Sequence, residues 1–101
     1  EVCRERDLKL ANVFHAGDGN LHPNISYDRR DPEEVRRVLE AGRLIMEACV
    51  EAGGSLTGEH GIGLEKRAFL GVTRNDAEVA LMRSLKQALD PNGLLNPGRI
   101  F

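Results

Sequence analysis

The chain has 101 residues, of which 41% are hydrophobic and 30% are charged, and its formal net charge is -2. This length accommodates one small domain with a modest core and leaves no room for a second complete domain. The small net charge and the lack of a long run of one sign argue against a nucleic acid or an anionic membrane as partner.

Cysteine usage and hydropathy indicate the cellular compartment in which the protein works. The two cysteines, Cys3 and Cys49, lie in segments expected to be helical, so we expect two free thiols and a reducing compartment. No apolar stretch reaches the roughly 18 to 20 residues that cross a bilayer, and no signal peptide opens the chain. The sequence predicts a soluble, cytoplasmic protein. Because its first residue is not methionine, we expect it to be a fragment of a longer polypeptide.

Two strands are predicted near the amino end, from about Leu8 to Phe14 and from about Leu21 to Tyr27. They flank the glycine-rich stretch Gly17-Asp18-Gly19-Asn20. An Asp-Gly pair between two strands favours a type I′ hairpin turn, because both central residues of that turn need positive φ. The sequence therefore predicts an antiparallel hairpin with Asp-Gly as its two-residue loop.

Two helices are predicted after the hairpin. The first has Asp31 as N-cap, Pro32 at its first position and Glu34 in its first turn, and it ends at Gly53-Gly54. Its apolar stripe includes Met46 and Cys49, which we expect in the core.

After a short extended piece from Ser55 to Thr57, the second helix is predicted to begin with Thr73 as cap and Asp76 at its third position. It is predicted to end at Asp90, because Pro91 disfavours helical geometry at the residue before it. Its stripe should contain Val79, Met82, Leu85 and Leu89. We expect the tail to form an ordered turn and a short extended end. These elements predict an α+β fold, with an antiparallel sheet and helices on one face.

The three histidines of the chain all lie in or beside glycine-rich turns. With a two-residue loop, His15 lies opposite His22, and such side chains have Cβ atoms roughly 4.5–5.5 Å apart on one face of the sheet. Both imidazoles can then bind one divalent ion. Two histidines seven residues apart are by themselves more often a coincidence than a metal site. The hypothesis of a metal site therefore rests on the pairing of the two histidines in the hairpin. Asn24 shares the face by the period-2 rule and should lie near any metal.

A second glycine-rich turn, GEHGIG, offers the remaining groups. Glu59 is the natural third ligand, since two histidines and a carboxylate with an open position form the catalytic pattern of zinc or another first-row metal. Such an ion polarises a substrate oxygen, which leaves His60 to move a proton. Alternatively, GEHGIG is a plain loop whose glycines serve chain reversal. It is not a dinucleotide fingerprint.

Three motifs together point to a family. HAGDGNLHPN (15–24), GEHGIGLEK (58–66) and DPNGLLNPGRIF (90–101) resemble, in order and spacing, the C-terminal region of FAD-linked oxidases of the vanillyl-alcohol oxidase superfamily. The resemblance runs from about Ala11 onward. It looks closest to the D subunit of glycolate oxidase, in a group that also includes D-lactate and D-2-hydroxyglutarate dehydrogenases. It implies that residues 1–101 are the C-terminal portion of a ferredoxin-like cap domain, with the FAD-binding domain absent from this chain.

The resemblance also implies a reaction, in which FAD takes a hydride from a D-2-hydroxy acid and a 2-oxo acid forms. The resemblance implies that His15, His22 and Glu59 bind a divalent metal, with zinc as the expected ion. It also implies that His60 is the base, that Asn24 contacts the substrate and that Asn96 lies near the flavin. Without the flavin domain, the isolated chain should bind FAD poorly and show no turnover.

Two other functions are compatible with the sequence. The histidines and Glu59 can form a purely structural metal site, or the chain can be an interaction module, since glycolate oxidase is a multi-subunit assembly in the family. The resemblance then implies other oxidase subunits as partners and a location in the cytoplasm or peripheral to the inner membrane through a complex. Truncation should expose apolar surface and cause self-association.

Overall fold

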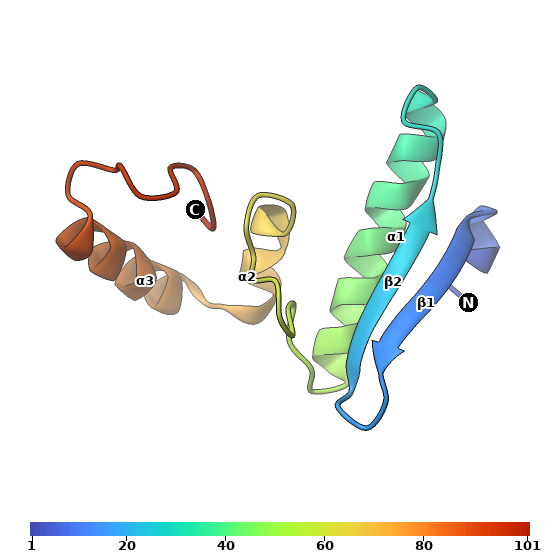
Figure 1. Cartoon of the computed structure of the whole chain (residues 1–101), viewed down its shortest axis with the longest axis horizontal. Coiled ribbons are helices and arrows are strands. Elements are labelled where there is room, and N and C mark those ends of the chain that lie inside the picture. Colours follow the sequence, from blue (N-terminus) through green and yellow to red (C-terminus); the bar gives the residue numbers. More distant parts are fainter. The chain divides into compact units, whose positions relative to one another are not determined.

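The computed structural model describes residues 1–101 and divides the chain into two compact units, Glu1–Cys49 and Val50–Phe101 (Figure 1). The first unit carries the hairpin and most of the long helix. The second unit carries the glycine-rich turn GEHGIG, the short helices and the tail.

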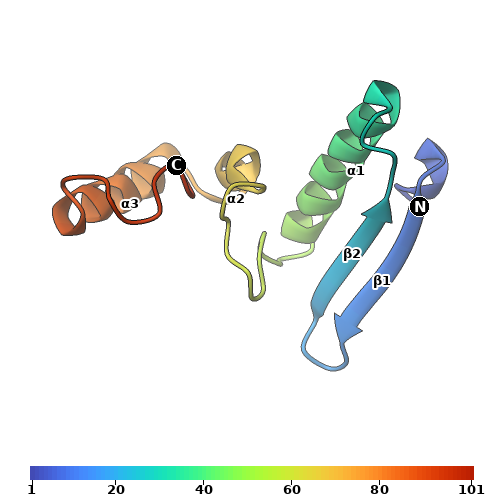
Figure 2. The ribbon, with the colours of Figure 1, turned by 45° about the horizontal axis from the view of Figure 1, so that its top comes forward.

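The first unit opens with a 3-10 turn, η1 (Arg4–Arg6), followed by strands β1 (Lys9–His15) and β2 (Asn20–Ser26) and by helix α1 (Pro32–Glu51). The two strands pair antiparallel and form a two-stranded sheet. Helix α1 lies along the hairpin in both views (Figures 1 and 2). The predicted hairpin, and the α+β class, are confirmed.

A small apolar cluster joins these elements. Cys3, Leu8 and Ala41 are buried, and Ala41 has no exposed surface. Val2, Ile25, Val38 and Ile45 pack against this cluster. Because Ile25 alternates with His22 and Asn24 along β2, the hairpin packs on α1 with the face opposite the histidines. Met46 and Cys49, predicted as core, are only half-buried. Cys3 and Cys49 form no disulfide, as predicted.

The ends of α1 follow the predicted signals. The Asp31 carboxylate accepts hydrogen bonds from the amides of Glu33 at 2.9 Å and Glu34 at 3.3 Å. At the other end, Gly53 adopts a φ of +84° and donates its amide to the carbonyl of Val50, 2.9 Å away. The N-cap and the glycine stop are thus both confirmed.

The second unit contains the 3-10 turn η2 (Arg67–Phe69) and helices α2 (Leu70–Thr73) and α3 (Asp76–Leu89). The predicted start of α3 was wrong: its N-cap is Asn75, whose side chain accepts from the Glu78 amide at 3.0 Å while Glu78 accepts from the Asn75 amide at 2.9 Å. This reciprocal capping box satisfies two helix-end donors, whereas Thr73 belongs to the short helix α2. Asp76 therefore occupies the first helical position.

The end of α3 is at Leu89, with Asp90 as C-cap, as predicted. Val79 and Met82 of the predicted stripe are half-buried, but Leu85 and Leu89 are exposed. After the helix, the tail folds back over α3 (Figures 1 and 2). It forms turns and bends without a strand, and the predicted extended piece from Ser55 to Thr57 forms no strand either.

Candidate functional site

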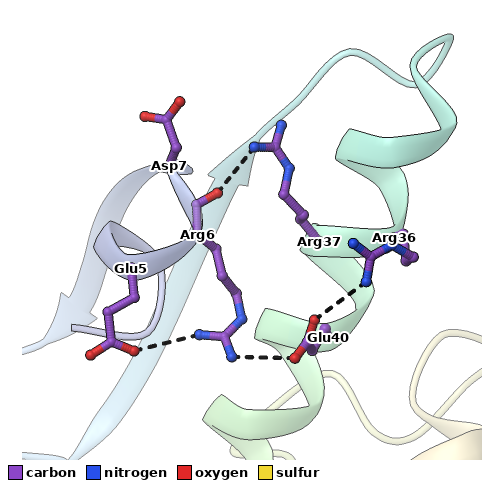
Figure 3. Close-up of a pocket in the computed structure, with 6 residues that line it drawn as sticks. All are labelled: Glu5, Arg6, Asp7, Arg36, Arg37 and Glu40. Carbon is purple, nitrogen blue, oxygen red and sulfur yellow. Dashed lines mark hydrogen bonds and ion pairs between the residues drawn. The ribbon is translucent and has the colours of Figure 1, made fainter.

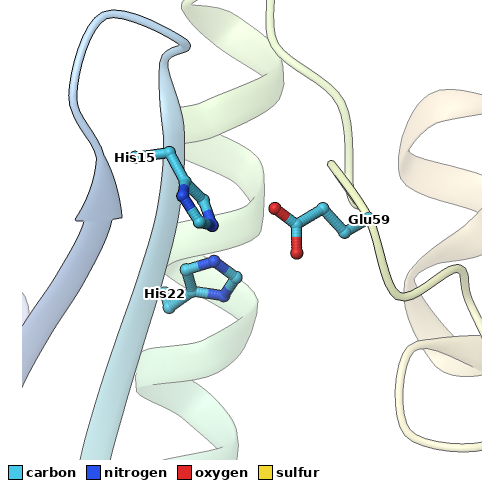
Figure 4. A group of neighbouring side chains, drawn as sticks. All are labelled: His15, His22 and Glu59. Carbon is cyan, nitrogen blue, oxygen red and sulfur yellow. The ribbon is translucent and has the colours of Figure 1, made fainter.

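The hairpin brings His15 and His22 together. Their ring centroids lie 5.4 Å apart and the ring planes meet at 76°, an edge-to-face arrangement. Figure 4 shows both rings on the same side of the hairpin. His15 is exposed and His22 is half-buried. The predicted proximity of the two imidazoles is therefore confirmed.

The predicted register, however, was wrong. His15 pairs with Asn20, and His22 pairs with Val13, so the two histidines are diagonal rather than opposed. Residues 16–19 form the loop, with a hydrogen bond from the Asp18 amide to the His15 carbonyl at 3.2 Å.

The turn chemistry explains this difference. Positive φ occurs at Gly17 (+88°) and Gly19 (+68°), but not at Asp18. A type I′ turn centred on Asp18 and Gly19 needs positive φ at both, whereas the observed loop places each left-handed conformation on a glycine. Since the shift in register is two residues, every side chain keeps its predicted face.

Asn24 lies on the same face as the histidines. In β2 it follows His22 by two residues, and it pairs with Ala11 of β1. Its side chain is exposed. This face thus presents two imidazoles and one carboxamide to a molecule approaching the hairpin.

In the second unit, Glu59 and His60 project from a glycine-rich turn. Their side chains are 46% and 73% exposed, and His60 Nε2 lies 3.7 Å from Glu59 Oε2. The turn reverses through Gly61 and Gly63, which have φ values of +75° and +57°. The Gly61 amide donates to Thr57 Oγ1 at 2.8 Å. A carboxylate and an imidazole are therefore held next to each other at an accessible place.

The donor chemistry of these side chains suits a first-row metal. His15 and His22 each offer one ring nitrogen, and Glu59 offers one carboxylate oxygen. Two imidazoles that share one hairpin face and point to the same side can bind one ion, which is the arrangement of catalytic zinc sites with a carboxylate as third ligand. On this criterion the residues of the hairpin fit a divalent metal.

Asn96, expected near a flavin, lies in the tail after α3. It is exposed and adopts a left-handed φ of 45°, and its carbonyl accepts from the Arg99 amide at 3.2 Å. Asn tolerates this conformation better than most residues with a Cβ. No contact of its side chain assigns it a function.

A charged cavity of about 480 Å³ lies elsewhere in the first unit, between η1 and α1 (Figure 3). Arg6 Nη2 contacts Glu40 Oε1 at 3.3 Å, and Arg6 Nη1 lies 3.7 Å from Glu5 Oε2. The lining residues are Glu5, Arg6, Asp7, Arg36, Arg37 and Glu40. Since acidic and basic groups balance each other here, the cavity offers no net charge to a ligand.

None of the helices is both long enough and apolar enough to cross a membrane.

Comparisons with known proteins place the chain in a family. The family of FAD linked oxidases, C-terminal domain, matches residues 1–100. Glycolate oxidase subunit GlcD of Escherichia coli (strain K12) is 51% identical over 98 residues, which cover 97% of this chain and 20% of that protein. A D-2-hydroxyglutarate dehydrogenase of Stutzerimonas stutzeri (strain A1501) is 38% identical over 97 residues, with 94% of this chain and 21% of the relative covered.

The mitochondrial D-lactate dehydrogenase [cytochrome] of Kluyveromyces lactis is 42% identical over 101 residues, covering 100% of this chain and 17% of that protein. The chain thus spans about a fifth of the length of the curated relatives that it matches. Family match and relatives agree with the three motifs, and the chain belongs to the C-terminal domain family of FAD-linked oxidases.

Proposed function

We propose that this chain is the metal- and substrate-binding part of an FAD-dependent dehydrogenase that oxidises a D-2-hydroxy acid to the 2-oxo acid. The proposal rests on the imidazoles of His15 and His22, which lie on one face of the hairpin with their ring centroids 5.4 Å apart. The relatives also support the proposal, because proteins named glycolate oxidase, D-2-hydroxyglutarate dehydrogenase and D-lactate dehydrogenase are similar to this chain over nearly its whole length.

In this proposal His15, His22 and Glu59 hold a divalent metal, with zinc as the ion that best suits two imidazoles and a carboxylate. The metal supplies Lewis acidity toward an oxygen of the α-hydroxycarboxylate, and FAD supplies the hydride acceptor. Holding the substrate through its hydroxyl and carboxylate orients the C–H bond for transfer.

His60 is the proposed base. Its imidazole can accept the hydroxyl proton as the C–H bond breaks, because histidine is the side chain that most often serves as a general base. Its neighbour Glu59, 3.7 Å away, stabilises the imidazolium that results. Asn24, on the face of the histidines, donates a hydrogen bond to the substrate, and Asn96 lies toward the flavin. Charge and protons balance: the hydride leaves for the flavin and the proton for His60.

Zinc titration of the chain by calorimetry tests the metal site. Binding of one zinc ion per chain is expected, with loss of at least about tenfold in affinity for His15→Ala, His22→Ala and Glu59→Gln. Asn12→Ala, on the opposite face of β1, is the matched control and should bind as the wild type does. Equal zinc affinity in the control and in the histidine variants would contradict the proposed metal site.

A structural metal site is the competing function, and His60 separates the two. In the full-length enzyme, His60→Asn should abolish turnover and leave the metal content intact, because a structural site has no use for a proton acceptor. Normal turnover of that variant would reject the base. The isolated 101-residue segment should show no reduction of a dye by glycolate, D-lactate or D-2-hydroxyglutarate, because residues 1–100 match the C-terminal domain of FAD-linked oxidases.

We further propose that the complete enzyme works in the cytoplasm or at the periphery of the inner membrane, together with other oxidase subunits. Reconstitution of the full-length protein with candidate subunits, followed by size-exclusion chromatography, tests this assembly. Elution of the protein alone in every mixture would contradict it.

A further inference from the structure

The carboxyl-terminal tail is bonded to the turn that carries Glu59 and His60. The amide of Ile100 donates to the carbonyl of Gly63 across 2.8 Å, and both residues belong to the second unit. Gly63 is the last residue of the GEHGIG turn. This contact links residues that are 37 positions apart in the chain (100 minus 63).

Ile100 makes this bond in an unfavourable conformation. Its φ is +72°, which is rare for residues with a Cβ and a true outlier for a β-branched one. Such conformations persist only where the surroundings fix them, and they concentrate at functional sites. The strain therefore points to a function for the bond between Ile100 and Gly63.

Anchors on both sides hold Ile100 in place. On one side the ring of Phe101 lies with its centroid 4.8 Å from the guanidinium carbon of Arg83 on α3. On the other side Lys86 Nζ donates to the Leu95 carbonyl at 2.6 Å. The tail is thus fixed to α3 before and after it reaches Gly63.

The turn itself needs such an anchor. Gly61 and Gly63 both have positive φ, and glycine loses more conformational entropy on ordering than any other residue. At its start, the turn is held by the hydrogen bond from the Gly61 amide to Thr57 Oγ1. The bond from Ile100 fixes its end.

We propose that Ile100 is a positioning residue, whose amide fixes the turn that presents Glu59 and His60. The role of those two side chains as metal ligand and base rests on the proposed function above. Ile100 touches neither of the reacting groups in this scheme. It acts by restricting the backbone from which both side chains project.

Two substitutions at one position separate the amide from the side chain. Ile100→Pro removes the donor and cannot adopt positive φ, whereas Ile100→Gly keeps the donor and adopts positive φ without strain. A chain ending at Arg99 removes the donor without inserting a proline. Nitrogen-15 relaxation of the 101-residue chain then reports the order of the Gly61 and Gly63 amides.

In the wild type and in Ile100→Gly, order parameters of about 0.85 are expected for these amides, and below about 0.6 in Ile100→Pro and in the shortened chain. The amides of β1 and β2 serve as internal controls and should not change. Equal order of the turn in all four proteins, or a mobile turn in the wild type, would overturn the proposal.

Measuring the zinc affinity of the same four proteins tests whether order in the GEHGIG turn affects the proposed metal site. Ile100→Pro should bind zinc about tenfold more weakly, and Ile100→Gly should bind like the wild type. A wild type that binds no zinc rejects the proposed metal site, and the relaxation data still decide whether Ile100 orders the turn. A disordered turn with unchanged zinc affinity would refute the positioning role while leaving the metal site in place.

Discussion

Lys86 and Asp90 lie one helical turn apart at the end of α3, and the ammonium of Lys86 pairs with the Asp90 carboxylate. The same carboxylate accepts the amides of Leu94 and Leu95, each at 2.9 Å. The Asp90 side chain is only 5% exposed. One carboxylate therefore joins the end of the helix to the first turn of the tail.

These contacts predict a pH dependence of stability. The Lys86 ammonium foremost, and then the Leu95 and Leu94 amides, lower the pKa of Asp90. A carboxyl group with a depressed pKa in the folded state contributes stability above its unfolded pKa of about 3.9 and loses it as the pH falls toward the folded pKa. Asp90→Asn should lower the melting temperature by about 5 °C at pH 7.

The difference between the two proteins should shrink as the pH is lowered from about 5 to 3. Melting curves followed by circular dichroism at several pH values measure it. A constant difference across this range would show that the charge of Asp90 does not stabilise the fold.

The capping box of α3 should be measurable by itself. Asn75→Ala removes the acceptor of the Glu78 amide, so the free energy of unfolding should fall by about 1 kcal/mol. Asn75→Ser, which keeps an N-capping oxygen, is the control and should lose much less. Urea denaturation gives both values, and equal losses would contradict the cap.

Glycines in two conformations should respond oppositely to alanine. No atom lies within 4 Å of a Cβ added at Gly17, Gly19 or Gly42, so backbone conformation alone decides the effect. Gly17→Ala and Gly19→Ala place a side chain at positive φ and should each cost about 1–2 kcal/mol. Gly42→Ala, inside α1, should stabilise by about 0.5–1 kcal/mol.

Urea denaturation of the three alanine variants checks these signs. The hairpin variants should also bind zinc more weakly, because a loosened turn no longer fixes the two imidazoles. Destabilisation by Gly42→Ala would mean that this helical position has a close packing partner.

Helix α3 exposes a leucine stripe made of Leu81, Leu85 and Leu89, which are 62%, 56% and 81% exposed. Residues four apart share one helix face, so the three side chains form a continuous apolar surface. We expect the isolated chain to self-associate through it. Sedimentation velocity should show a mass that rises with concentration, and Leu85→Glu should reduce it.

Ala80→Glu adds the same charge at an exposed position of α3 outside this stripe and is the control. Association that is reduced equally by both substitutions would assign the effect to net charge instead of the leucine stripe.

Zinc should stabilise the chain by mass action if the proposed site exists. At a free zinc concentration of about 100 times the dissociation constant, the expected gain is about 2.7 kcal/mol. Melting curves with and without zinc, followed by addition of a chelator, measure it. His22→Ala should show no gain, and an equal gain in that variant would place the bound zinc elsewhere.

Local signals predicted the elements well, because they depend on residues close in sequence. Asp31 and Pro32 fix the start of α1, and Pro91 fixes the end of α3. The start of α3 was misplaced because Thr73 and Asn75 are both capable caps, and only the reciprocal bond with Glu78 selects Asn75. The choice between them depends on side-chain geometry that a propensity does not contain.

The candidate site was predictable where it depends on faces of a strand. His15, His22 and Asn24 share a face in both the predicted and the observed register, since the two differ by an even number of residues. The bond between Ile100 and Gly63 could not be predicted. It joins distant segments through a backbone amide and carbonyl, and no side-chain pattern encodes such a pair.

Ala41 illustrates how little space the first unit leaves between its layers. Its methyl group is completely enclosed, next to Cys3 and Leu8. A valine there would add two methyl groups to a fully enclosed position, and overpacking of this kind forces side chains off their rotamers and shifts the backbone. Because Ile25 of β2 packs against the same cluster, the smallest side chain of the core helps to set how closely α1 and the hairpin can approach.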